Sequence, residues 1–183
     1  MAVQAQRMTV EEFDEFVGQP EHADRLFEYI GGEVVEVVSS QRASAIAYNV
    51  GFFLKLHLRT NNIAGLVTGA DGGYEIAGER YIPDVAFVSA SRQAAPSERA
   101  YSPIPPDLAV EALSPSNMPH EMRLKLVNYL AAGTTVWIVD PERQLVEVYT
   151  PGRAAKTVRA DGTLDGGDVL PGFRLAVQDI FAG

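Results

Sequence analysis

Two acidic residues lie in apolar, strand-like segments, where a charged side chain is costly. Glu111 interrupts the segment LAVEAL at 108–113, and Asp84 follows Pro83 at the start of VAFV at 85–88. A buried carboxylate must be paired, protonated, placed at a sheet edge or bound to a metal ion. If the two strands are neighbours, the carboxylates converge, and a hard oxygen-seeking cation such as Mg²⁺ relieves their repulsion. Asp84 and Glu111 are therefore candidate ligands of a divalent metal ion.

Lys125 is the candidate cationic group. It lies in the helix expected after the Glu111 strand, and a helix packed on that strand could carry its ammonium over the metal site. Purely structural interpretations stay open for all three residues. Asp84 could cap backbone amides at a strand start. Glu111 could form an ion pair with Arg80, Arg123 or Lys125, and Lys125 could instead lie on a solvated helix face.

The neighbouring segments have the patterns of elements that could position these residues. Thr9 and Glu12 form a capping-box pattern for a short helix ending near Gly18. Apolar residues recur at helical spacing over 44–59 and 118–132, and Gly133 is a natural helix end. Strands are expected at 27–30, 33–38, 65–69, 73–76, 84–89, 108–113, 136–139 and 146–149.

The order of these elements predicts the architecture. Strand, helix and strand over 108–139 imply a parallel crossover, and alternation within the first strand places Glu111 on one face with Ala109 and Leu113. The segments at 27–38, joined by a two-glycine turn, imply an antiparallel hairpin, and 91–106 is expected as a surface loop. We expect a single α/β domain over 1–183, with a mixed central β-sheet flanked by helices and added antiparallel hairpins.

Composition narrows the class of protein. The chain has 183 residues, a net charge of -9 and no cysteine, so disulfides and thiolate metal sites are excluded. Its pI near 4.8 argues against a simple nucleic-acid-binding module, which is usually basic. It argues less against an enzyme, because a bound cation offsets acidic ligands locally. No segment approaches the roughly 20 apolar residues that cross a bilayer, and we expect a cytoplasmic protein without membrane partners.

Several longer motifs resemble one known family. They are FEYIGGEVV at 27–35, IPDVAFV at 82–88, PDLAVEALSPS at 106–116, KLVNYLAAG at 125–133, WIVDP at 137–141 and DVLPGF at 168–173. Their order and spacing resemble the Uma-two family, bacterial proteins classed as restriction endonucleases with the PD-(D/E)XK nuclease core. The resemblance covers nearly the whole chain and implies a restriction-endonuclease-like fold.

The resemblance also implies roles for individual residues. Asp84 matches the motif aspartate, Glu111 the second metal-binding acid, and Glu28 a family glutamate that completes the acidic cluster. Lys125 matches a lysine on the following helix, whereas the position two residues after Glu111 is Leu113, so the usual E-x-K spacing is absent. A histidine that relatives often carry at the head of the long helix is missing, because QRA stands at 41–43.

These observations predict a metal-dependent endonuclease that hydrolyses DNA phosphodiester bonds with Mg²⁺ or Mn²⁺. Asp84, Glu111, Lys125 and Glu28 would form the catalytic site, and Asp84 and Glu111 would hold the metal ion. A homodimer is expected, since duplex cleavage generally needs two sites. The main alternative is a noncatalytic nuclease-fold module that binds a partner protein or DNA, and a weaker one is a hydrolase of small phosphate esters.

Overall fold

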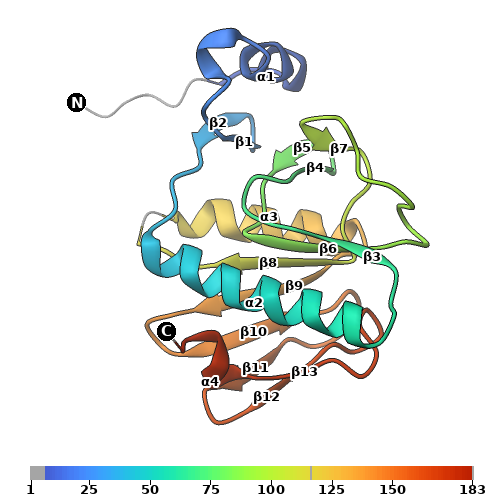
Figure 1. The fold of residues 1–183 in the computed structure, drawn as a ribbon. Helices are drawn as coiled ribbons and strands as arrows, with labels where there is room; N and C mark the ends of the chain where they lie inside the picture. The colour runs from blue at the N-terminus through green and yellow to red at the C-terminus, as the bar shows by residue number, and fades with distance from the viewer. Residues whose placement is uncertain (1–6, 116, 183) are drawn as a thin grey trace.

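The computed structural model describes residues 7–115 and 117–182, and it has the mixed α/β architecture expected (Figure 1). The larger sheet has the strand order β11 (Lys156–Arg159), β10 (Leu145–Tyr149), β9 (Thr135–Asp140), β8 (Leu108–Ala112), β6 (Val85–Ser89) and β3 (Gly65–Thr68). The smaller sheet has the order β2 (Glu33–Glu36), β1 (Phe27–Ile30), β5 (Glu79–Tyr81), β4 (Gly73–Ile76) and β7 (Tyr101–Ser102). A separate hairpin joins β12 (Thr163–Asp165) and β13 (Arg174–Ala176).

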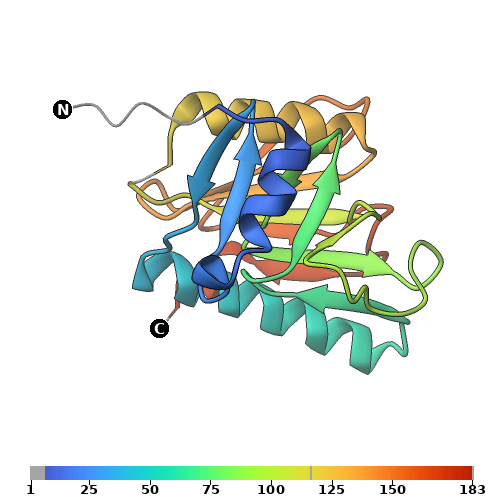
Figure 2. The same ribbon diagram turned by 90° about the horizontal axis from the view of Figure 1, so that it is seen from above.

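The helices lie on the faces and edges of these sheets. They are α1 (Val10–Val17), α2 (Gln41–Thr60), α3 (Pro119–Ala131) and α4 (Val177–Ile180), with a short 3-10 turn, η1 (Pro20–His22). Figure 2 shows α2 and α3 on opposite sides of the larger sheet and α1 over the smaller one. Among the described residues, no helix is long and apolar enough to cross a membrane.

The larger sheet contains the predicted crossover. Strand β8 runs parallel to β9, with α3 between them in the chain, and antiparallel to β6 on its other side. Alternate residues of β8 face different cores. Val110 packs in the core under α2, and Ala109 packs in the core under α3. This alternation places Glu111 on the α3 side of the sheet, on the same face as Ala109 and Leu113, and that shared face is what the sequence pattern predicted.

The smaller sheet begins with the predicted hairpin of β1 and β2. Gly31 and Gly32 form its two-residue turn with φ values of 61° and 86°. Positive φ at both turn residues twists the chain in the direction that the strands require, which is why glycine is favoured there. The smaller sheet packs against the α3 side of the larger one through residues such as Tyr74 and Ile76. The core on the α3 side of the larger sheet is therefore enclosed by the two sheets and α3.

Three elements differ from the expectation. Helix α2 begins at Gln41 rather than at 44, because the Ser40 side chain accepts a hydrogen bond from the Ala43 amide and caps the helix earlier. Strand β5 was not expected, since Glu79 and Arg80 give it no apolar pattern; Arg80 is buried through an ion pair with Asp14 at 2.7 Å. Strand β7 lies inside the expected loop at 91–106.

Candidate active site

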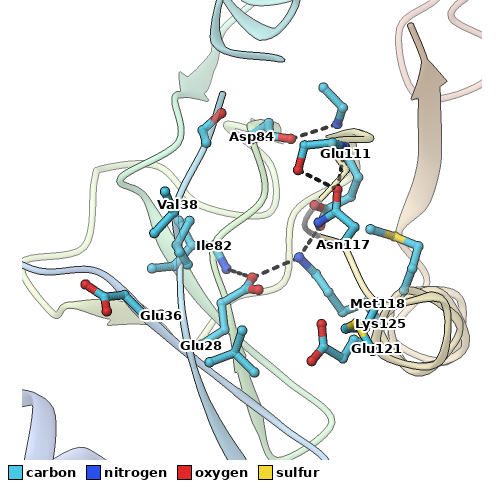
Figure 3. Close-up of a pocket in the computed structure, with 16 residues that line it drawn as sticks. Glu28, Glu36, Val38, Ile82, Asp84, Glu111, Asn117, Met118, Glu121 and Lys125 are labelled. Atoms are coloured by element: carbon cyan, nitrogen blue, oxygen red, sulfur yellow. Dashed lines mark hydrogen bonds and ion pairs between the residues drawn. The ribbon is translucent and has the colours of Figure 1, made fainter. Parts of the chain in front are cut away.

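Asp84 and Glu111 approach one another at the ends of two neighbouring strands. Val85 of β6 pairs with Val110 of β8, so one further step along the antiparallel register sets Asp84 opposite Glu111. Asp84 has the same parity as Ala86, which packs in the core under α3. Both carboxylates consequently point to one side of the sheet and line one pocket (Figure 3).

Asp84 is held at this position by a backbone hydrogen bond. Its Oδ2 accepts a hydrogen bond from the Ala112 amide at 2.7 Å. The amide that Asp84 caps therefore belongs to the neighbouring strand β8 and not to the strand that Asp84 precedes. Glu111 is 5% exposed. Its Oε1 accepts a hydrogen bond from the Tyr129 hydroxyl at 3.0 Å. Both acids are thus fixed in direction before any ligand binds.

Lys125 is the cation of the pocket and does not lie on a solvated helix face. It is 5% exposed, and its Nζ lies 2.8 Å from Oε1 of Glu111 and 2.8 Å from Oε1 of Glu28. Glu28 comes from β1, inside the smaller sheet, and its Oε1 also accepts from the Ile82 amide at 2.6 Å. The lysine therefore connects the two sheets. The structure brings all four candidate residues of the sequence analysis into one pocket.

Burial and charge shift the pKa values of these groups. Burial raises the pKa of Glu111 to about 8, with the charges of Glu28 and Asp84 acting in the same direction and Lys125 against them. Burial also raises the pKa of Asp84. For Lys125, burial lowers the pKa, but the carboxylates of Glu111 and Glu28 outweigh it and raise the pKa above its ordinary value. The metal-free pocket consequently favours a protonated carboxyl and a charged lysine.

The pocket has a volume of about 240 Å³ and is strongly acidic. Besides Glu28, Asp84 and Glu111, the carboxylates of Glu36 and Glu121 line it, against the single lysine. A phosphodiester carries one negative charge, so an unassisted approach to these acids would be repelled. The pocket therefore suits an anionic substrate only when a cation accompanies it.

The donor set fits Mg²⁺ or Mn²⁺. Among the described residues, no three acidic or histidine side chains are close enough to form a complete metal-binding group. Within the same residues, Oδ1 of Asp84 and Oε2 of Glu111 have no hydrogen-bond or ion-pair partner, so each carboxylate keeps one oxygen for a cation. Mg²⁺ usually retains several waters and binds through one or two carboxylates together with substrate phosphates. Two free carboxylate oxygens are enough for such a site.

Sequence reasoning missed a residue that contacts Glu111 and two residues that line the pocket. Tyr129 lies one turn after Lys125 on α3, and the i, i+4 spacing was the signal that both side chains share a face. Ser114 and Asn117 line the pocket, and the side-chain Oδ1 of Asn117 accepts a hydrogen bond from the Ser114 amide at 2.6 Å. Nothing in their sequence context separates them from ordinary turn residues.

The fold and this acidic pocket define a restriction-endonuclease-like α/β protein. The model of the Uma2 family, described as "Putative restriction endonuclease", matches residues 10–178, and the chain belongs to this family. Among solved structures, it is similar to a "putative nuclease belonging to DUF820 from Anabaena variabilis ATCC 29413". The two share 21% sequence identity and a TM-score of 0.81, over 95% of this chain and 97% of the other. No curated protein sequence gives a significant match.

Proposed function

We propose that this protein is a metal-dependent endonuclease that hydrolyses DNA phosphodiester bonds, with Mg²⁺ or Mn²⁺ held by Asp84 and Glu111. One observation carries the proposal: two carboxylates from adjacent strands meet in a pocket that also contains a buried lysine. Membership of a family described as restriction endonucleases supports DNA as the substrate.

The residues of the pocket would divide the chemistry as follows. A bound Mg²⁺ or Mn²⁺ supplies an activated water and offsets the charge that develops on the phosphate. Lys125 would donate a hydrogen bond from Nζ to the attacking water or to a phosphate oxygen. Glu28 would position that ammonium together with Glu111, since Oε1 of each glutamate lies 2.8 Å from Nζ of Lys125. Asp84 is kept in place by its bond to the Ala112 amide.

Nicking of supercoiled plasmid DNA tests the proposal. The wild-type protein should convert supercoiled to open-circular or linear DNA in Mg²⁺ or Mn²⁺ and should be inactive in EDTA. Asp84→Asn and Glu111→Gln should each abolish nicking, because they remove metal ligands of nearly unchanged size. Glu98→Gln, at an exposed loop carboxylate outside the pocket, is the matched control and should keep full activity. Equal nicking by wild type and Asp84→Asn would refute the assignment.

One observation favours a noncatalytic module as the second candidate. Lys125 pairs with Glu28 and Glu111 at once, so the acidic cluster is partly neutralised without a metal ion. Such a network could serve only to join the two sheets. Calorimetric titration with Mn²⁺ separates the candidates: binding that is lost in Glu111→Gln supports the enzyme, and no binding supports the module.

A homodimer forms part of the proposal, because cutting both strands of a duplex generally requires two active sites. Sedimentation velocity would give the mass in solution. If the protein is a monomer that nicks one strand, the homodimer is wrong but the proposed chemistry still holds.

A further inference from the structure

Helix α2 carries charged residues of one sign. Its 20 residues include Arg42, Lys55 and Arg59 and no aspartate or glutamate, although the whole chain has a net charge of -9. In the part of the chain that the structure describes, neither Lys55 nor Arg59 forms a salt bridge. Lys55 and Arg59 are therefore available to bind an anionic ligand, although the protein as a whole is acidic.

The same face of α2 exposes two aromatic rings. Tyr48 is 75% exposed and Phe52 is 53% exposed, and they are one helical turn apart. At 100° per residue, Lys55 and Arg59 point in nearly the same direction as this pair. Exposed rings interleaved with cations are typical of surfaces that bind single-stranded nucleic acid, where bases stack on rings and phosphates contact the cations.

A groove beside this face leads to the candidate active site. It has a volume of about 430 Å³ and lies between α2 and the edge strand β3. Tyr48, Phe52 and Lys55 line it from the helix, and residues 67–70, at the end of β3 and directly after it, line it from the other side. Asp84 and Ser39 line both this groove and the acidic pocket. The groove and the acidic pocket therefore adjoin at these two residues.

Gly51 keeps the groove open. It lines the groove in the middle of α2, where glycine costs about 1 kcal/mol relative to alanine. A Cβ at this position would lie 3.8 Å from the nearest atoms, the methyl groups of Val85, which is ordinary contact. Neither sterics nor backbone conformation requires glycine here, so its effect is to leave space beside Tyr48 and Phe52.

We propose that this groove binds a single-stranded segment of DNA. The unpaired bases stack on Tyr48 and Phe52, and Lys55 and Arg59 contact the phosphates. The strand then passes its next phosphodiester to Asp84. The inference rests on the proposed function and specifies its substrate as a strand whose bases are unpaired at the site. Ring faces favour single strands over duplexes, because base faces in a duplex are covered by their neighbours.

A second copy of the chain is the competing occupant, since exposed rings also suit a protein interface. The charges argue against it. In a two-fold interface the patch meets its own copy, which brings the cations of both copies into one interface with no acidic residue of α2 to offset them.

Fluorescence anisotropy with a labelled oligothymidine of about 12 nucleotides, in EDTA to prevent cleavage, tests the inference. The wild-type protein should bind this single strand more tightly than a duplex of equal length. Tyr48→Ala and Phe52→Ala should each weaken binding about 5- to 150-fold, the range for losing one stacked base. Lys55→Glu should weaken binding and reduce its dependence on salt. Val127→Ala and Lys156→Glu, at exposed positions on α3 and β11, are the matched controls and should bind as wild type.

Gly51→Ala provides an independent variant. It should leave the melting temperature unchanged or higher, because the helix gains a better helix former, yet it should weaken binding several-fold by narrowing the groove. A structural role for Gly51 would lower the melting temperature instead.

The outcomes separate this inference from the proposed function. Asp84→Asn should still bind single strands while losing cleavage, and a protein that never cleaves could still bind through the groove. Unchanged affinity in Tyr48→Ala and Phe52→Ala overturns the inference, as does a preference for duplex. Conversion of a dimer to a monomer by these variants, with no change in DNA binding, would assign the face to a second copy.

Discussion

Replacing Lys125 with methionine tests how the acidic pocket is stabilised. Methionine keeps the unbranched stem but removes the ammonium that lies 2.8 Å from both Glu28 and Glu111. Since burial raises the pKa of Glu111, this carboxyl takes up a proton more readily than an ordinary glutamate does. The carboxylate newly left without a cation is then Glu28, which is 6% exposed.

The stability that Lys125→Met loses has an upper limit, because protonation of the unpaired carboxylate is an alternative to keeping it charged. A buried carboxylate without a partner can take up a proton instead of remaining charged. With an ordinary glutamate pKa of about 4.3 and about 1.36 kcal/mol per pH unit, protonating one such group at pH 7 costs about 3.7 kcal/mol. Breaking buried ion pairs by removing one partner typically costs about 3–5 kcal/mol. We therefore expect Lys125→Met to lower the free energy of unfolding by about 3–4 kcal/mol at pH 7.

The expected loss depends on pH. Without Lys125, the charge that lowers the pKa of Glu111 is gone, so this carboxyl has a higher pKa in the folded than in the unfolded chain and the folded variant binds more protons. Its stability therefore falls as pH rises from the ordinary glutamate pKa toward the raised folded value. At pH 5 the cost of protonating one carboxyl is only about 1 kcal/mol. The gap between variant and wild type should narrow accordingly on acidification.

Urea unfolding followed by tryptophan fluorescence measures these differences, because Trp137 is the single tryptophan and lies in the core of the larger sheet. With a slope of about 2 kcal/mol per molar urea, the midpoint should fall by about 1.5–2 M at pH 7. Arg123→Met, at an exposed position of the same helix, is the control. The double variant of Glu28→Gln with Lys125→Met should recover most of the loss. A loss that does not change with pH, or no recovery in the double variant, would refute the reasoning.

Three further predictions concern the other groups of the pocket. Asp84→Ala should be less stable than Asp84→Asn by about 1–2 kcal/mol in thermal or urea unfolding, because only asparagine still accepts from the buried Ala112 amide. Mn²⁺ binding should strengthen from pH 6 to about pH 8 and then level off, because the raised pKa of Glu111 means that a proton leaves as the cation binds; calorimetry in buffers of different ionisation enthalpy would count that proton. Tyr129→Phe should cost about 1 kcal/mol of stability, measured by urea unfolding, because Glu111 loses one hydrogen bond.

Local patterns in the sequence predicted the parts of the fold that depend on neighbouring residues. The capping box of Thr9 and Glu12 forms as expected, with the Thr9 amide donating to Glu12 at 2.7 Å. Strand alternation put Glu111 on the correct face, because side chains in a strand alternate regardless of what packs on them. The parallel pairing of β8 with β9 also followed from element order.

Contacts between distant segments could not be derived in this way. Glu28 and Lys125 are 97 residues apart, and they meet because the smaller sheet packs over α3. The hydrophobic pattern of either segment gives no sign of that packing. The polar strand β5 was missed for a related reason, since Arg80 becomes buried only when Asp14 of α1 reaches it. The resemblance to the family assigned Glu28 to the cluster, whereas its partner became visible only in three dimensions.

The balance of charge in the pocket explains why a lysine stands among its acids. With all groups ionised, Glu28, Asp84, Glu111 and Lys125 carry a formal charge of -2, which one divalent cation would neutralise. Without that cation, burial raises the pKa of Glu111 and favours its protonated form. If the site holds a divalent metal ion as proposed, Lys125 reduces the charge of these three acids to one that a single such ion neutralises. It also fixes Glu111 through one oxygen, Oε1, and leaves the other for the cation.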